Sequence, residues 1–149
     1  YGDAWLVGGA SNSGGAVLSH FFSAEELTRY SALIDPKQPS EFDYYPLPSI
    51  GERFPIADSQ LKPQLEPMPD NDPVKFLHGL LEGIARIEQL GYEKLAELGA
   101  PARGNLYTVG GGSINPQWQA IRERRLGKLV EVPQHTEAAY GVAKLALRS

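Results

Sequence analysis

Proline distribution constrains this 149-residue chain more than any other feature, because nine of its twelve prolines lie between Pro36 and Pro73. Proline has no backbone N–H and a fixed φ, so neither a regular helix nor a central strand can persist over that stretch. The stretch also carries apolar side chains that can anchor it: Phe42, Tyr44, Tyr45, Leu47, Ile50, Phe54 and Ile56. We therefore expect a packed, irregular excursion over 36–73 rather than a disordered linker.

Ahead of this excursion, the chain alternates between strand-like and helix-like patterns. The apolar run 4–7 predicts a strand that stops at a pair of glycines, and the apolar spacing over 16–22 predicts a helix. Ser23 lies three residues before Glu26, which is the spacing of a capping box. We expect that box to open a second short helix that continues to Ile34.

The longest predicted helix follows the excursion. Asp72 is a suitable N-cap, Pro73 suits the first helical position, and Gly99 is a suitable terminator. The apolar face of this helix comprises Leu77, Leu80, Leu81, Ile84, Ile87, Leu95 and Leu98. Gly83 falls inside that face, where the absence of a side chain would let a neighbouring backbone come close.

Strand and helix patterns alternate again in the last third of the chain. Strands at 105–109 and 129–132 flank a helix over 116–126, and Thr136 is placed to cap a final helix. The buried side of that final helix is predicted to hold Ala139, Val142, Ala143, Leu145 and Ala146. Together these elements indicate one α/β domain over 1–149.

Composition restricts the partners and the compartment. With 21% charged residues and a net charge of -4, the chain implies no broad attraction to nucleic acid or to an anionic membrane. It has no cysteine and no apolar run near the roughly 20 residues that span a bilayer. We expect a soluble, cytoplasmic protein. The chain starts at Tyr1 with a strand pattern under way, which suggests a processed chain or a piece of a longer one.

Other candidate catalytic groups are sparse. His20, His78 and His135 are scattered, so a zinc site is not expected. Arg122, Arg124, Arg125 and Lys128 form a basic run that we interpret as a solvated helix face. The adjacent Glu52 and Arg53 suit an ion pair that fixes the irregular excursion, and a catalytic role is the alternative.

The first glycine-rich segment, 8–15, does not fit the named phosphate or nucleophile motifs. A Walker loop needs Lys after its second glycine, a dinucleotide fingerprint needs an acidic residue that ends the next strand, and a nucleophile elbow needs glycine where Ser13 stands. Two interpretations remain open. Bare backbone N–H groups before a helix can bind an anion, and a simple strand-to-helix turn uses the same residues.

The second glycine-rich segment, 110–112, is followed by groups with more chemical character. The Asn115 amide can hydrogen-bond the edge of a base, and Trp118 lies three residues later, where its ring could cover a base face. The alternative is that Trp118 is a core residue.

Five segments then show a resemblance that covers nearly the whole chain. The chain resembles the C-terminal domain of the FGGY carbohydrate kinases, the group that contains xylulokinase, ribulokinase and glycerol kinase. The matching segments, in family order, are 9–16 (GASNSGGA), 51–55 (GERFP), 81–85 (LEGIA), 110–116 (GGGSINP) and 133–143 (PQHTEAAYGVA).

The resemblance implies an actin-like, ribonuclease H-like ATPase fold in which two domains close on ATP and a sugar, with this chain as the C-terminal half and the first strands of its domain preceding Tyr1. The positions that match nucleotide contacts of the family are Gly15, Ser19, Gly111, Gly112, Asn115 and Trp118. Gly111 and Gly112 would lie against the phosphates or ribose, with Asn115 and Trp118 at the adenine. Ser19 replaces the longer amide that some members carry there.

The resemblance also implies in-line transfer of the γ-phosphate of MgATP to a sugar hydroxyl. Residues 65–73 look most like the branch that phosphorylates ketopentoses such as ribulose or xylulose. The sugar pocket and the catalytic base belong to the N-terminal kinase domain of the same protein, so no catalytic residue or metal ligand is expected in this chain, and the chain alone should be inactive. A nucleotide-binding sensor without phosphoryl transfer and an inactive fragment are the alternatives.

Overall fold

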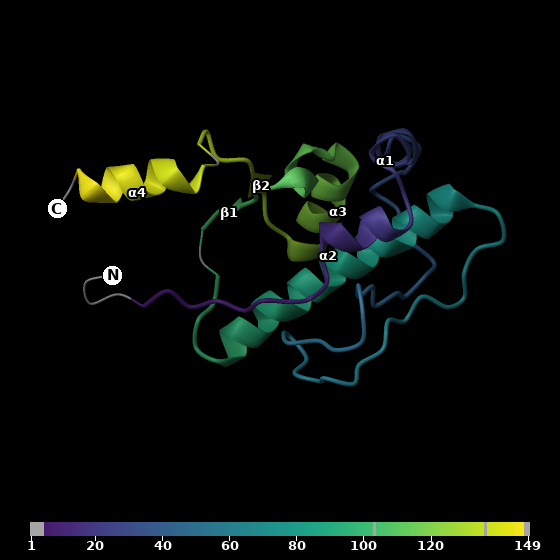
Figure 1. Cartoon of the computed structure of the whole chain (residues 1–149), viewed down its shortest axis with the longest axis horizontal. Helices are drawn as coiled ribbons and strands as arrows, with labels where there is room; N and C mark the ends of the chain where they lie inside the picture. Colours follow the sequence, from purple (N-terminus) through teal and green to yellow (C-terminus); the bar gives the residue numbers. More distant parts are fainter. Residues whose placement is uncertain (1–4, 103, 136, 148–149) are drawn as a thin grey trace.

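The computed structural model describes residues 5–102, 104–135 and 137–147. It is a mixed structure of helices and strands around one long helix (Figure 1). The elements, in chain order, are the 3-10 helix η1 (Gly15–His20), α1 (Ala24–Ser31), α2 (Pro73–Glu97), β1 (Leu106–Tyr107), the 3-10 helix η2 (Gly111–Ile114), α3 (Pro116–Leu126), β2 (Val130–Glu131) and α4 (Ala138–Ala146).

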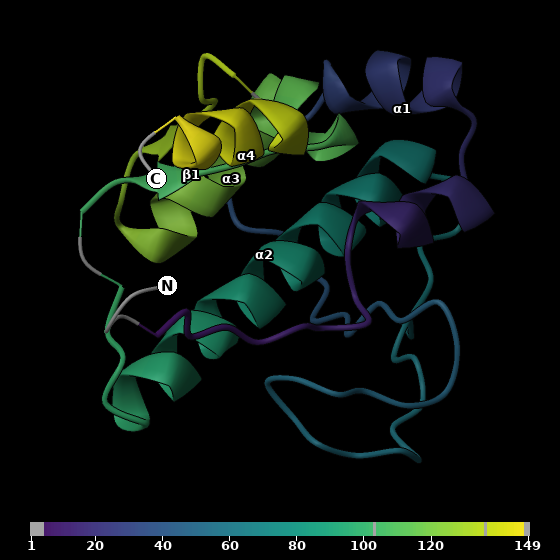
Figure 2. The same cartoon turned by 60° about the vertical axis from the view of Figure 1, so that its left-hand side comes forward.

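Helix α2 is the central element, with η1, α1 and α3 packed against it and the irregular excursion along another side (Figures 1 and 2). The predicted cap is confirmed, because Asp72 Oδ1 accepts a hydrogen bond of 3.0 Å from the Lys75 N–H and Pro73 is the first helical residue. Gly99, at φ 89°, follows the end of the helix as expected.

The predicted apolar face of α2 is buried from Leu77 to Ile87. Leu98 is exposed, contrary to the prediction, because the helix ends at Glu97 and Leu98 is its C-cap. A backbone does approach Gly83, as predicted. A Cβ built on Gly83 would lie 2.5 Å from the Tyr44 carbonyl oxygen.

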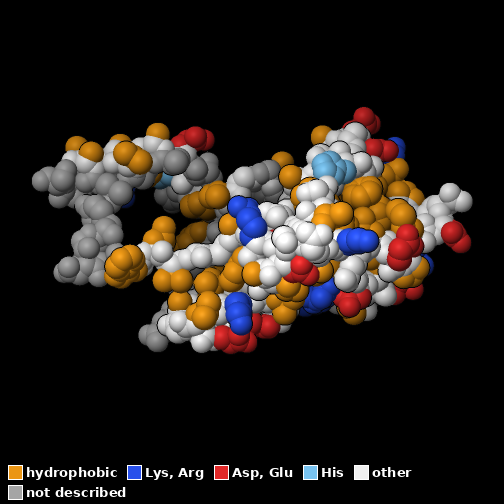
Figure 3. All heavy atoms as spheres, turned by 60° about the horizontal axis from the view of Figure 1, so that its bottom comes forward, with side chains coloured by type: hydrophobic (Ala, Val, Ile, Leu, Met, Phe, Trp, Pro, Cys, Tyr) orange, Lys and Arg blue, Asp and Glu red, His pale blue; other side chains and the backbone are white. Residues whose placement is uncertain are grey.

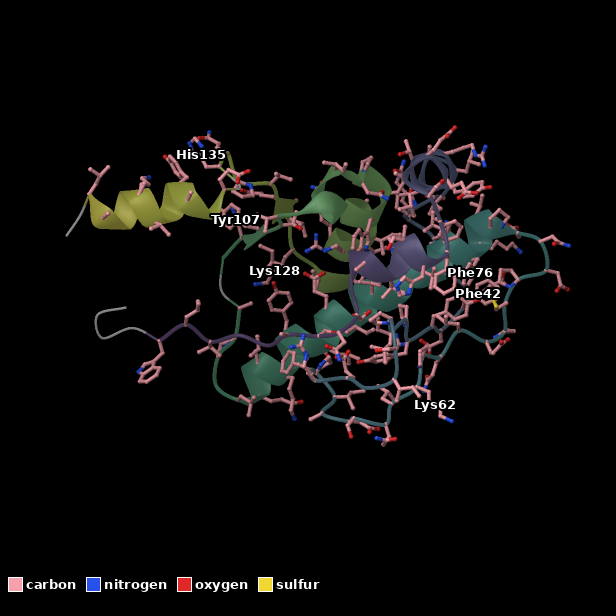
Figure 4. The ribbon with its side chains drawn as sticks, in the orientation of Figure 1. Phe42, Lys62, Phe76, Tyr107, Lys128 and His135 are labelled. Carbon is pink, nitrogen blue, oxygen red and sulfur yellow. The ribbon has the colours of Figure 1, made fainter. Side chains whose placement is uncertain are left out.

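The excursion has no regular helix or strand within the described residues, as its prolines predict. It is held by isolated bridges that pair Tyr45 with Gln64 and Glu52 with Asp58. Its aromatic residues pack on α2: Phe42 stacks on Tyr44, whose ring meets Phe76 edge to face, and Figure 4 shows Phe42 and Phe76 close together. The excursion is therefore part of the core.

The prediction that apolar side chains anchor the excursion is wrong for two residues, Ile50 and Ile56. Ile56 lies in the loop that the Glu52–Asp58 bridge closes, Ile50 lies just before that loop, and both side chains are exposed. Apolar character alone did not reveal that these two side chains face solvent.

The helices before the excursion follow the predicted order with local differences. The first is a 3-10 helix whose tighter turn buries Val17 and Leu18 and leaves Phe21 partly exposed. The capping box is present, since Ser23 Oγ accepts from the Glu26 N–H and Glu26 Oε2 accepts from the Ser23 N–H. Helix α1 then ends at Ser31, short of the predicted Ile34.

The sheet is smaller than the strand patterns predict. β1 and β2 form one parallel pair of two residues each, with Leu106 opposite Val130, so the predicted strands 105–109 and 129–132 form only at their centres. The predicted strand 4–7 is wrong for its described part, 5–7. Leu6 is fully exposed, and no other described segment pairs with these residues to form the hydrogen bonds that a strand requires.

Helix α4 projects from one end of the molecule, where hydrophobic side chains remain on the surface (Figures 1 and 3). Its predicted buried side is wrong for the residues whose side chains are described: Ala139, Val142, Ala143 and Ala146 are exposed. The predicted helix is present, but no element of the described structure covers its apolar face. The predicted cap Thr136 and the side chain of Leu145 lie outside the described residues. None of the helices within the described ranges has the length and apolar character needed to span a bilayer.

Candidate functional site

The two glycine-rich segments meet at the ring of Trp118. A Cβ on Gly15 would lie 3.6 Å from the Cζ3 and Cη2 atoms of that ring, whereas a Cβ on Gly112 would overlap the ring itself. Gly112 therefore permits the close approach of η2 to α3. Trp118 is only 9% exposed and belongs to the main core cluster, so the core alternative is correct for most of its surface.

Trp118 also lines a cleft of about 1180 Å³. The lining comes from the first glycine turn, η1, α1, Phe54 of the excursion, the middle and C-terminal part of α2, and the region from β1 to α3. Of the six predicted nucleotide contacts, Gly15, Gly112, Asn115 and Trp118 line it. Gly111 begins η2 beside Gly112.

Ser19 is not among the residues that line this cleft. Its side chain is exposed on η1, and its hydroxyl donates a 2.7 Å hydrogen bond to the Ala16 carbonyl oxygen. The structure therefore does not bring Ser19 together with the other predicted contacts.

The cleft lining combines two kinds of chemistry. Helix α1 contributes the apolar Ala24 and Leu27 together with Thr28 and Ser31. The first glycine turn contributes Gly8, Gly9, Ser11 and Ser13, and the segment that follows β1 contributes Thr108 and Val109. The lining thus offers apolar surface that suits a flat group, as well as small residues and hydroxyls.

Asn115 has a structural role that the sequence interpretation missed. Its Oδ1 accepts a 3.0 Å hydrogen bond from the Trp118 N–H and caps α3, while its Nδ2 donates to Ser31 Oγ at 2.8 Å. The signal was present, because asparagine directly before a proline at the first helical position is a typical N-cap. These bonds fix the amide where the start of α3 meets the cleft.

The basic run on α3 is not a solvated face, so that prediction is wrong. Arg122 makes a bidentate pair with Glu88 of α2, at 2.7 Å and 2.8 Å, and its Nη1 donates to Thr108 Oγ1 at 2.9 Å. The hydrogen bonds that Arg122 donates to Glu88 are the main cause that raises the pKa of Arg122. Glu88 and Arg122 both line the cleft, and they neutralise each other there.

The next two arginines reach a second glutamate of α2. Arg124 and Arg125 both donate to the carboxylate of Glu82, which is 1% exposed. Burial alone would raise the pKa of Glu82, but His78, Arg125 and Arg124 together hold it below its ordinary value of 4.5. The sequence could not show these pairs, because they form only when α3 crosses α2.

Lys128, the last member of the basic run, donates to the Ala102 carbonyl oxygen. Figure 4 shows it beside the segment that leads into β1.

Glu52 links the excursion to the first glycine turn. The residue is 3% exposed, and its carboxylate accepts hydrogen bonds from Ser11 Oγ at 2.6 Å and from the Asn12 N–H at 2.7 Å. The predicted ion pair with Arg53 is not what fixes the excursion, because Arg53 Nε donates instead to Asn12 Oδ1 at 2.6 Å. The anchoring role of Glu52 is thus correct, with different partners.

The charge of Glu52 is well accommodated despite its burial. Burial alone would raise its pKa, but hydrogen bonds from the backbone of Asn12, the hydroxyl of Ser11, and the backbone N–H groups of Arg53 and Phe54 lower it below 4.5. The carboxylate is therefore ionised at neutral pH and already saturated with donors, so it is unsuited to act as a base.

Two buried polar atoms of cleft residues lack a hydrogen-bond partner in the described part of the chain: Ser13 Oγ and Trp118 Nε1. Unpaired buried groups are uncommon in folded proteins and are often found at functional sites. No group of three or more His, Asp and Glu side chains that could hold a metal ion occurs in the ranges that the structure covers.

A known protein family matches the chain over its full length. The model of the FGGY family of carbohydrate kinases, C-terminal domain, matches residues 1–149. The match covers both glycine-rich segments, the excursion and all the described elements. The chain therefore belongs to the FGGY family of carbohydrate kinases.

Proposed function

We propose that this chain supplies the nucleotide-binding side of an ATP-dependent sugar kinase that phosphorylates a ketopentose such as ribulose or xylulose. The observation that carries the proposal is the single cleft that both glycine-rich segments face, with Trp118 between them. Glycines and the start of a helix that open onto the same space suit a ligand with both a flat ring and a phosphate chain.

The adenine of ATP fits the side of the cleft formed by α1 and the start of α3. The edge of Trp118 and the apolar Leu27 offer contact to a base, and Asn115 presents an amide whose orientation the bonds to Ser31 and the helix fix. Gly15, beside the Trp118 ring, leaves the space that a side chain would fill.

The phosphates fit the side formed by the first glycine turn and η2. The charged residues of the described lining, Glu88 and Arg122, are paired with each other. Backbone N–H groups of the glycine-rich turns, together with hydroxyls such as Ser13 Oγ, are therefore the donors that this chain offers to phosphate oxygens. Mg²⁺, when bound, would be held through those phosphates, in keeping with its preference for few protein ligands.

The chemistry assigned to this chain is positioning. Bound MgATP supplies the γ-phosphoryl group that passes in line to a sugar hydroxyl. The residues of this cleft hold the nucleotide in one orientation, while the sugar pocket and the base that accepts the hydroxyl proton are assigned to an N-terminal domain. The assignment of a ketopentose as the substrate rests on the likeness of residues 65–73 to that branch of the family.

Gly15→Leu tests the nucleotide site. The added Cβ makes an ordinary 3.6 Å contact with Trp118, so the fold should persist while the rest of the side chain fills the cleft. Calorimetry on the full-length protein should show ADP affinity weakened by about tenfold or more, a loss typical of a blocked contact. His20→Leu is the control in the same 3-10 helix, because His20 is exposed and does not line the cleft. Equal ADP affinity in Gly15→Leu and wild type would reject the site.

Turnover distinguishes a kinase from a nucleotide-binding sensor. The full-length protein should consume ATP when ribulose or xylulose is present and not in the absence of sugar. Tight ADP binding without ATP consumption for any of a panel of pentoses, hexoses and polyols would favour the sensor.

A further inference from the structure

The turn that the proposed function assigns to the phosphates is held in shape by a residue that does not line the cleft. Ser11 and Ser13 of the turn line the cleft, and Glu52 does not. The Glu52 carboxylate lies behind the turn and accepts from Ser11 Oγ and from the Asn12 N–H. The two hydrogen bonds join residues that are 41 and 40 positions apart in the sequence.

A second layer of hydrogen bonds continues from these contacts. The Ser13 N–H donates to Ser11 Oγ at 2.9 Å, so the hydroxyl that Glu52 fixes also fixes the next part of the turn. Asn12 Nδ2 donates to the Gly51 carbonyl oxygen at 3.0 Å, and Asn12 Oδ1 accepts from Arg53. Hydrogen bonds from both backbone and side-chain groups thus hold residues 11–13 to residues 51–53.

This attachment matters because the turn is open at two of its glycines. Glycine gives the backbone wide conformational freedom. A Cβ on Gly8 or Gly14 would meet nothing within 4 Å, whereas Gly9 lies against the Phe54 ring and Gly15 against the Trp118 ring. Between Gly9 and Gly14, the hydrogen bonds to Glu52 therefore hold the turn. The Tyr45 hydroxyl, at 3.2 Å from Glu52 Oε2, completes the burial of the carboxylate on the excursion side.

We infer that Glu52 is a positioning residue for the phosphates of the bound nucleotide, acting through Ser11 and Asn12 on the first glycine turn. Since the Asn12 and Ser13 N–H groups donate within the protein, Glu52 acts by fixing the conformation of the turn and thereby the direction of its other N–H groups, and it touches neither the nucleotide nor the sugar. The inference rests on the proposed function, and it predicts that a change at Glu52 weakens the binding of ADP and leaves the binding of adenosine unchanged.

The test compares ADP with adenosine. Glu52→Gln keeps the size of the side chain but places an amide NH₂ among groups that donate, so the turn loses acceptors. In the full-length protein, calorimetry should show ADP affinity reduced by about tenfold, the loss expected for a hydrogen bond to a charged group. Adenosine affinity should stay within about twofold of wild type.

Two further variants keep the inference falsifiable. Glu66→Gln makes the same change in the same excursion, where Glu66 accepts from the exposed Met68 N–H, and should leave both affinities unchanged. Ser11→Ala removes the hydrogen bond to Glu52 and the one from the Ser13 N–H, keeps the buried charge and its bond from the Asn12 N–H, and should give a smaller loss, also restricted to ADP. It serves as the test if Glu52→Gln does not fold.

The outcomes separate the two proposals. Loss of ADP affinity with adenosine unchanged supports the inference. Equal loss of both ligands, or no loss, in a variant with the thermal midpoint of wild type overturns it while the nucleotide site stands. Failure of the wild-type protein to bind either ligand rejects the proposed function itself.

Discussion

Gly83→Ala should destabilise the protein although alanine is the better helix former. Gly83 lies inside α2, where Ala would gain about 1 kcal/mol of helix propensity. Its Cβ, however, would lie 2.5 Å from the Tyr44 carbonyl oxygen and 2.9 Å from Pro46 Cδ. The carbonyl cannot retreat freely, because it also accepts a 2.9 Å hydrogen bond from Arg86 Nη2.

The expected net effect follows from these opposing terms. Overpacking costs about 1–3 kcal/mol, and a weakened hydrogen bond to the Arg86 guanidinium adds about 1 kcal/mol. After the propensity gain, we expect a loss of about 2 kcal/mol, which corresponds to a fall of about 4–8 °C in the thermal midpoint of a domain of this size.

Gly91→Ala is the matched control in the same helix. Its Cβ would lie 3.1 Å from Cε1 of the half-buried Phe54, a ring that can shift by a few tenths of an ångström. We expect its stability to remain within about 0.5 kcal/mol of wild type or to rise. Differential scanning calorimetry measures both variants. If Gly83→Ala melts at or above Gly91→Ala, the close approach of the excursion to α2 is not a constraint.

Three further outcomes follow from the buried polar contacts. Glu82→Gln should lower the free energy of unfolding, measured in urea, by about 3 kcal/mol, because two arginines lose their charged partner. Glu97→Gln breaks only the exposed pair with Lys94 and should lower it by at most about 0.5 kcal/mol, so equal losses would contradict the reasoning. Asn115→Ala removes the cap of α3 and should lower the free energy of unfolding by about 1 kcal/mol, and Asn115→Asp should retain most of that stability. Unchanged stability in Asn115→Ala would reject the capping role. The lowered pKa values of Glu52 and Glu82 mean that their stabilisation is complete above pH 4.5 and lost as the pH falls below it. The urea midpoint of Glu52→Gln should therefore fall less steeply with acid than that of wild type, and an equal slope would refute the assignment.

The sequence predicted those features that depend on a few neighbouring residues. Asp72 with Pro73, and Ser23 with Glu26, satisfy the first N–H groups of their helices within one turn, so the local pattern contains the whole interaction. The excursion was equally predictable, because proline acts on the backbone of its own residue and its immediate neighbours.

Features that depend on distant partners could not be predicted in this way. The pair of Arg122 with Glu88 spans 34 residues, and the bond of Glu52 to Ser11 spans 41. A basic run or an isolated glutamate has the same pattern whether it faces water or another helix. The same reason explains 5–7, whose strand-like pattern finds no partner strand in the described structure.

At the candidate site, chemistry and resemblance together predicted that Gly15, Gly112, Asn115 and Trp118 would converge. They did not predict that Asn115 is bound to Ser31, or that Trp118 is at once a wall of the cleft and part of the core. Both properties arise from the packing of α3 onto the rest of the molecule.

Segments without regular structure are commonly treated as the replaceable parts of a protein, where insertions, deletions and grafts are accepted. The excursion would not behave in that way. Tyr44 is packed into the helical core at one point of it, and Glu52 holds the glycine turn at another. A chimera that exchanged this segment between related kinases would therefore have to exchange the facing surface of α2 and the glycine turn with it, because the three fit one another as a set.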